Sequence, residues 1–252
     1  MDRFSQLEFG EARRSGAKAP GGEPIRDEQY FYKQGLRYWL AGDFEPALRN
    51  YSRALEKNST FLEGWIGQVL MLIELGEYRE AMVWSDKALE LFPEHPELLA
   101  AKAVTCARDG RKEKALAYSD NSIAKDNVTS RVWLARAEVL LGRKSPIAEN
   151  CVSKAISIAG NDGPVIHLEA GRVLNKAGNY YGALENLREA VKLLPKSALA
   201  WYELGYCQGK LGFSEAAAAV EQSLKLHPRW DIAEMTLRRF KKRGFFRKLF
   251  GK

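Results

Sequence analysis

Apolar residues along most of this chain recur three and four positions apart, and glycines and small residues interrupt them at regular places. In "GLRYWLAGDFEPALRNYSRAL" (35–55), an apolar stretch is followed by Gly42 and then by a second apolar stretch. Intervals of three and four match the period of an α-helix, and a glycine allows the tight turn between two helices. The pattern predicts a pair of antiparallel helices.

The same pattern returns every 34 residues. Steps of 34 from Phe31 meet Trp65, Leu99, Trp133, His167 and Trp201. Two series of small residues keep nearly the same period: Ala47, Ala81, Ala115, Ala148, Ala183 and Ala216, and then Ala54, Ala88, Ser122, Ala155, Ala190 and Ser223. Small residues let neighbouring helices approach closely. Because one helix pair cannot bury its own apolar face, the pairs are expected to stack into a solenoid.

Three segments, "WYELG" (201–205), "GALENLREAVKLLP" (182–195) and the stretch at 35–55, give the chain its resemblance to the tetratricopeptide repeat (TPR) family. The resemblance implies an all-α, right-handed α-solenoid of about six helix-turn-helix repeats with a C-terminal capping helix. The repeats are expected at 28–61, 62–95, 96–129, 130–163, 164–197 and 198–230. In repeat three, Leu99 and Asn127 stand where the family prefers an aromatic residue and a proline. Repeat four loses one residue at its turn, in "GRKSPIAEN".

The two ends differ from this body. Residues 1–27 contain the Gly/Pro-rich "GAKAPGGEP" and are interpreted as a disordered tail, although Phe4 and Phe9 could dock in the protein's own groove. After repeat six, the spacing of Trp230, Ala233, Leu237 and Phe240 predicts a capping helix over 231–243. Residues 244–252 form a basic-aromatic tail, which either continues that helix or leaves it at Gly244.

The net charge of +7 lies entirely at the C-terminal end. Residues 229–252 hold nine basic and two acidic residues, so the other 228 residues hold thirty of each and are neutral. A neutral body argues against a broad nucleic-acid-binding surface. The tail could instead contact an anionic membrane surface, nucleic acid being the less favoured polyanion, or it could serve only for capping and solubility. The candidate contact residues are Arg238, Arg239, Lys241, Lys242, Arg243, Phe245, Phe246, Arg247, Lys248, Leu249 and Phe250.

Motifs for catalysis, cofactors or metals are missing from the sequence. The three cysteines and three histidines are widely spaced, without the paired spacing of a disulfide framework or a metal site. The longest nearly apolar stretch, "WIGQVLMLI" (65–73), is too short to span a bilayer, and the start lacks the apolar core of a signal peptide. We therefore expect a cytoplasmic, non-enzymatic protein without cofactors, with peripheral membrane attachment as the alternative location.

The resemblance also implies that the concave side of the solenoid, lined by the first helix of each repeat, binds a partner. The residues carried over as partner-binding are Tyr32, Trp39, Ile66, Ile73, Leu134, Arg172, Asn175, Lys176, Tyr202, Tyr206 and Lys210. Such a groove would be apolar in its first half and basic and aromatic in its second, suiting a peptide with apolar anchors and acidic residues. The carboxylate clamp of chaperone-binding family members is missing, since its places hold residues such as Leu36, Gly67 and Glu97.

These observations favour a protein–protein interaction adaptor or scaffold. The alternatives are a scaffold tethered to a membrane surface by its tail and, less favoured, a nucleic-acid-associated protein. The identity of the partner protein and the oligomeric state stay open, and a homo-oligomer is among the alternatives.

Overall fold

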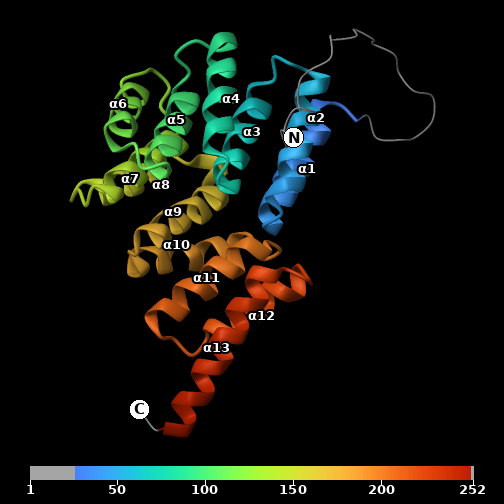
Figure 1. The fold of residues 1–252 in the computed structure, drawn as a ribbon, viewed down its shortest axis with the longest axis vertical. Helices are drawn as coiled ribbons and strands as arrows, with labels where there is room; N and C mark the ends of the chain where they lie inside the picture. Colours follow the sequence, from blue (N-terminus) through green and yellow to red (C-terminus); the bar gives the residue numbers. More distant parts are fainter. Residues whose placement is uncertain (1–25, 251–252) are drawn as a thin grey trace.

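The computed structural model describes the backbone of residues 26–250 and the side chains of residues 26–242. In this part of the chain, helices are the regular secondary structure, and six antiparallel pairs stack along the sequence (Figure 1). The pairs are α1 (Glu28–Ala41) with α2 (Phe44–Lys57), α3 (Leu62–Leu75) with α4 (Tyr78–Leu91), α5 (Pro96–Arg108) with α6 (Lys112–Ile123), α7 (Ser130–Gly142) with α8 (Ala148–Ser157), α9 (Gly163–Ala177) with α10 (Tyr180–Leu193), and α11 (Ala198–Leu211) with α12 (Ala216–Leu226). The expected all-α solenoid is confirmed.

The helix boundaries follow local sequence signals. The Asp27 side chain accepts a hydrogen bond from the Tyr30 amide at 2.8 Å, so it caps the N-terminus of α1. The helix ends at Gly42, whose φ of 88° lies in the left-handed region that glycine enters without steric cost. Each helix pair falls within one of the repeat ranges given above, except that α9 starts one residue earlier, at Gly163.

Small residues lie where neighbouring helices cross. All twelve alanines and serines of the two repeated series are buried, none with more than 4% of its surface exposed. The serines satisfy their hydroxyls on backbone oxygens, as Ser223 Oγ does by donating to the Ala198 carbonyl at 2.8 Å. A larger side chain at these positions would force the helices apart, so the period of 34 in the sequence reflects a repeated steric requirement.

Repeat four is the irregular one, as its shortened turn indicates. Its second helix, α8, has ten residues, and the 3₁₀ turn η2 (Gly160–Asp162) leads directly into α9. The Ala148 amide donates to the Ser145 carbonyl, so residues 145–147 form a turn before α8 begins. The stack nevertheless continues through this repeat, because Ala148 and Ala155 still occupy the buried small positions.

The first and last repeats meet, which closes the solenoid laterally (Figure 1). Ser197 Oγ donates to the Leu40 carbonyl at 2.7 Å, and His227 Nε2 lies 3.3 Å from Asp43 Oδ1. Trp230 packs directly over Gly42, where a Cβ would lie only 2.4 Å from the indole ring. These contacts join residues 157 to 188 positions apart, and periodicity within the sequence does not specify them.

The C-terminal helix α13 runs Asp231–Phe250. Ala233 is fully buried, and Phe240 lies against Gly209, so the apolar stripe packs on repeat six as a cap. The helix continues past Gly244. One glycine inside a helix costs only about 1 kcal/mol relative to alanine, which is too little to end it. The expected boundary between 231–243 and 244–252 is therefore not a helix end. The expectations for residues 1–25 lie outside the described residues.

Candidate functional site

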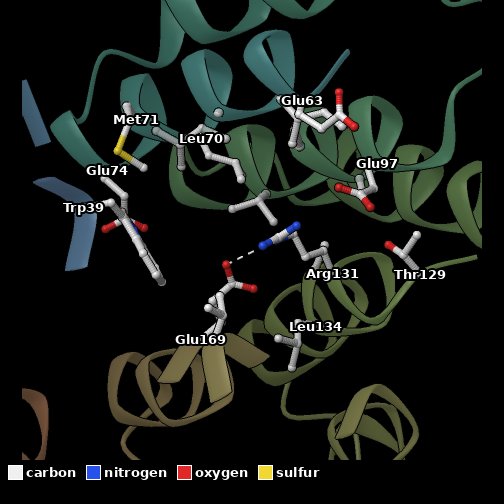
Figure 2. A pocket seen from close by; sticks show the side chains of 18 of the residues that line it. Trp39, Glu63, Leu70, Met71, Glu74, Glu97, Thr129, Arg131, Leu134 and Glu169 are labelled. Atoms are coloured by element: carbon white, nitrogen blue, oxygen red, sulfur yellow. Dashed lines mark hydrogen bonds and ion pairs between the residues drawn. The ribbon is translucent and has the colours of Figure 1, made fainter. Parts of the chain in front are cut away.

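The inner face of the laterally closed solenoid holds a chamber of about 510 Å³ that is open to solvent. It is lined by the first helices of repeats one to five, α1, α3, α5, α7 and α9, and Figure 2 shows their side chains converging on it. Its lining includes residues of both α1 and α9, the first and the last of these inner helices.

Apolar side chains line the middle of the chamber. Leu36, Leu70, Val104 and Leu134 come from four successive first helices, and Trp39 joins them from α1. Small residues such as Ala101 leave the space that larger side chains would fill. A dry apolar wall of this kind offers an incoming apolar group stabilisation of roughly 25 cal/mol per Å² of covered surface.

One mouth of the chamber carries excess negative charge. Glu63, Glu97 and Glu169 line it around the cation Arg131 (Figure 2). Asp162 lines the same mouth. Arg131 Nε donates to Glu169 Oε1 at 3.3 Å. Burial raises the pKa of Glu169, and Arg131 offsets this only in part while Glu97 adds to it. This mouth therefore holds four carboxyl groups and one cation, Arg131, to balance them.

The opposite end of the chamber holds a balanced ionic network. Glu74 accepts from Arg172 Nη2 at 2.6 Å, from Arg108 Nη1 at 3.1 Å and from Lys176 Nζ at 3.2 Å. Arg108 also donates two hydrogen bonds to the Glu138 carboxylate, from Nε at 2.7 Å and from Nη2 at 3.1 Å. Burial alone would raise the pKa of Glu74, but its cationic neighbours hold it well below its ordinary value.

Arg172 connects this network to both ends of the solenoid. Its Nε donates to Glu203 of α11 at 3.0 Å, and its guanidinium lies 5.6 Å from the ring centroid of Phe44 in α2. Asn175 Nδ2 donates to the same Glu203 at 3.0 Å. Repeats one, two, five and six are therefore joined through one arginine, which supports the closed form of the solenoid.

The residues predicted to bind a partner separate into two groups. Those that line the chamber are Tyr32, Trp39, Ile66, Ile73, Leu134, Arg172 and Lys176. Those that lie elsewhere are Asn175, Tyr202, Tyr206 and Lys210. Tyr202 packs on Trp230 with ring centroids 4.9 Å apart, and Lys210 lies 5.3 Å from the Tyr206 ring. These last contacts lie beside α13 and outside the chamber.

The expected basic and aromatic second half of the groove differs from the structure. Arg172 is 7% exposed and held between Glu74 and Glu203, so its charge is already neutralised. The reason is the closure of the solenoid, which brings Glu74 of repeat two to within contact of repeat five. An acidic ligand would have to displace Glu74 from Arg172.

The residues expected from the sequence to bind a partner include none of these carboxylates. A usable signal was present, since Glu63, Glu97 and Arg131 occupy one position of three successive repeats, each 34 residues apart. Glu74 and Arg108 share another such position, as do Glu138 and Arg172. Charges that recur at inner-face positions of a solenoid gather on one surface, whereas the same number scattered over outer faces do not.

Comparison with known families agrees with this architecture. The family described as "Tetratricopeptide repeat" matches residues 32–96, and that described as "TPR repeat" matches residues 171–212. The solved structure of TTC0263, a TPR protein of Thermus thermophilus, aligns with a TM-score of 0.53 over 71% of this chain and 98% of that one, at 18% identity. This chain is a tetratricopeptide repeat protein. Residues 97–170, between the two matched ranges, include the divergent repeats three and four and keep the same helix pairs.

Other TPR structures and sequences are similar over different shares of their length. The TPR chain aligns with the Cut9–Hcn1 hetero-tetramer structure at a TM-score of 0.54 and 17% identity, over 85% of this chain and 43% of that one. It is 26% identical over 172 residues to "Protein CTR9 homolog" of Arabidopsis thaliana, covering 64% of this chain and 16% of the plant protein. It is 37% identical over 59 residues to "Uncharacterized protein MJ0572" of Methanocaldococcus jannaschii, covering 23% of this chain and 69% of that one. These likenesses bear on the fold, and the chain spans only a small part of the plant relative.

Proposed function

We propose that this TPR protein is an interaction scaffold that holds a short segment of a partner protein in its central chamber. The observation that carries this proposal is the concave chamber with its exposed apolar wall. Leu36 and Leu70 keep part of their surface exposed inside it, whereas Val69 and Leu72 of α3 are fully buried. Apolar surface that the fold leaves uncovered in a concave site is characteristic of ligand binding.

The size of the chamber limits the length of the segment. One turn of α-helix, about 10 Å wide and 5.4 Å long, occupies roughly 420 Å³. The chamber of about 510 Å³ therefore accommodates about one helical turn or a few side chains of an extended segment. A long partner helix would extend out of a mouth, where the carboxylates stand.

A photo-crosslinking experiment tests this use of the chamber. A photoreactive phenylalanine analogue replaces Leu70, inside the chamber, and in a second variant Val83, which is 49% exposed on α4. After irradiation in cells that express each variant, mass spectrometry identifies the crosslinked peptides. A partner segment crosslinked from position 70 and not from position 83 is the expected result. The same products from both positions, or none from position 70, would contradict the proposal.

A second candidate function, attachment to a membrane surface, is favoured by the exposed face of α13. Ile232 and Met235 are 52% and 61% exposed there, and Arg239 and Lys242 are exposed on the same helix. Exposed apolar groups with cations further along the same helix suit an interfacial helix on anionic lipid, although Asp231 and Glu234 lie next to Ile232 and Met235. Within the described residues, no helix is both long and apolar enough to cross a bilayer.

Vesicle co-sedimentation tests the second candidate. The full chain is compared with a version ending at Arg243, on anionic and on neutral vesicles, at low and high salt. Binding of the full chain to anionic vesicles that partly survives high salt supports insertion of apolar groups. Equal binding by both versions would assign the contact to the face of α13 that both retain, whereas binding by neither would contradict this candidate. Binding to nucleic acid instead would fall steeply with salt.

A further inference from the structure

We propose that the chamber receives the C-terminal segment "RKLFGK" (247–252) of a second copy of this chain. The inference rests on the proposed use of the chamber as a binding site, and it names one occupant for it. The contact would be head-to-tail, because the chamber of one copy meets the end of the next copy. Three observations carry it: the charge of the mouth, the chemistry of the segment, and the direction of α13.

The mouth lacks positive charge that a ligand could supply. Glu63, Glu97, Asp162 and Glu169 face Arg131, which leaves a formal excess of three negative charges. At the far end, by contrast, the network around Glu74 is balanced by its own arginines and lysine. The acidic mouth therefore attracts a cationic ligand and repels an anionic one.

Two further atoms at this mouth lack partners within the described part of the chain. Thr129 Oγ1 and His95 Nδ1 are buried and without a hydrogen-bond partner, and both residues line the chamber. Figure 2 shows Thr129 beside Glu97 and Arg131. Buried polar atoms are ordinarily satisfied, so these two atoms leave hydrogen-bonding capacity unused beside the charged mouth.

The C-terminal segment has the matching composition. Residues 247–252 carry three basic side chains, Arg247, Lys248 and Lys252, and no acidic side chain, so the segment is cationic as the acidic mouth requires. Leu249 and Phe250 supply apolar groups for the leucine- and valine-lined interior. The last turn of α13, residues 247–250, needs roughly 420 Å³ of the available 510 Å³, so this turn fits within the chamber.

The direction of α13 makes the contact intermolecular. Its first half packs on α11 and α12, and its second half extends beyond the other helices and away from those that line the chamber (Figure 1). The segment therefore cannot enter the chamber of its own copy, and it projects where another copy can take it up. A repeated head-to-tail contact gives rings or open chains whose length grows with concentration.

Sedimentation velocity on the full chain over a range of concentrations tests this directly. The wild-type chain should self-associate, and raising the salt should weaken the association because the mouth contacts are ionic. The chamber variant, Glu63→Gln with Glu97→Gln, should lower the association constant about tenfold, since two ionic contacts of about 0.7 kcal/mol each are removed. The matched control, Glu56→Gln with Glu185→Gln, removes the same charge from exposed outer positions and should associate like the wild type.

A complementation experiment assigns the two surfaces. The tail variant, Arg247→Glu with Lys248→Glu, keeps its chamber and should not self-associate. The chamber variant keeps its tail and should associate weakly. An equimolar mixture of the two should form mainly dimers, because the intact tail of the chamber variant binds the intact chamber of the tail variant, and longer assemblies would need the weakened chamber.

The inference is overturned if the wild-type chain stays monomeric up to its solubility limit, or if the chamber variant associates as strongly as the outer control. Binding of the tail to anionic vesicles without self-association would likewise overturn it and assign the segment to a membrane. The proposed function fails separately. A monomeric chain that still crosslinks a partner segment from position 70 keeps the chamber as a binding site and loses only the second copy as its occupant.

Discussion

Substituting Gly42 by alanine tests the closure of the solenoid, on which the chamber depends. A Cβ at this position would lie 2.4 Å from Cζ2 and 2.6 Å from Cη2 of Trp230. Ordinary carbon contacts are about 3.5–4.0 Å, so the indole ring must move by about 1 Å or more. The variant also places alanine at a φ of 88°, which costs about 1–2 kcal/mol.

Gly76 provides the matched control. It ends α3 as Gly42 ends α1, with a φ of 80°, but a Cβ there would meet nothing within 4 Å. Gly76→Ala should therefore cost only the backbone contribution of about 1–2 kcal/mol. Gly42→Ala should cost that amount plus about 1–3 kcal/mol for displacing Trp230, by analogy with overpacking in cores.

The assay is urea unfolding followed by far-UV circular dichroism, which does not depend on the tryptophan signal. Each glycine variant is measured alone and in a Trp230→Ala background. Without the indole ring, the extra cost of Gly42→Ala should disappear and the two glycine variants should become equal. If they are already equal in the wild-type background, Trp230 does not lie on Gly42 in solution and the closed form of the solenoid is refuted.

Three other outcomes follow from the same structure. Glu74→Gln leaves its cationic neighbours without their shared carboxylate and should lower the free energy of unfolding by about 3 kcal/mol, measured by urea denaturation at pH 7. The pKa of Glu74 and of Glu138 is lower in the folded chain than their ordinary 4.5, so their contribution is complete above that pH. It is lost as the pH falls below 4.5, and Glu74→Gln should flatten this loss in denaturation at a series of pH values. Gly171→Ala would place a Cβ 2.4 Å from Leu187 and should destabilise by about 1–3 kcal/mol, whereas Gly142→Ala, in open space, should stabilise by up to about 1 kcal/mol in thermal unfolding.

Local sequence was sufficient for the helices and for their stacking. Each helix pair is specified by residues within one unit of 34, such as Asp27 at the start of α1, Gly42 at its end and Ala47 at the crossing. Contacts between successive repeats are also short in sequence. The same small and apolar positions form the contact between each repeat and the next. The pattern of one repeat therefore predicts the stacking of all six.

The candidate site was only partly accessible to the same reasoning. Tyr32, Ile66 and Leu134 were placed on the inner face, since the resemblance identifies the first helix of each repeat. The acidic mouth was overlooked because Glu97 and Glu169 look like ordinary surface carboxylates in sequence. Their position in the repeat places them on the inner face, where Glu169 is buried beside Arg131 and burial raises its pKa.

The sequence by itself determined the all-α class, the period, the six helix pairs and the concentration of positive charge at the C-terminal end. Tertiary structure alone decided that the solenoid closes, that Arg172 reaches Glu74 across 98 positions, and that Trp230 covers Gly42. The physical reason is that closure is the sum of small rotations between successive repeats. No single repeat encodes that sum, and only the complete stack brings its two ends, and therefore the chamber, together.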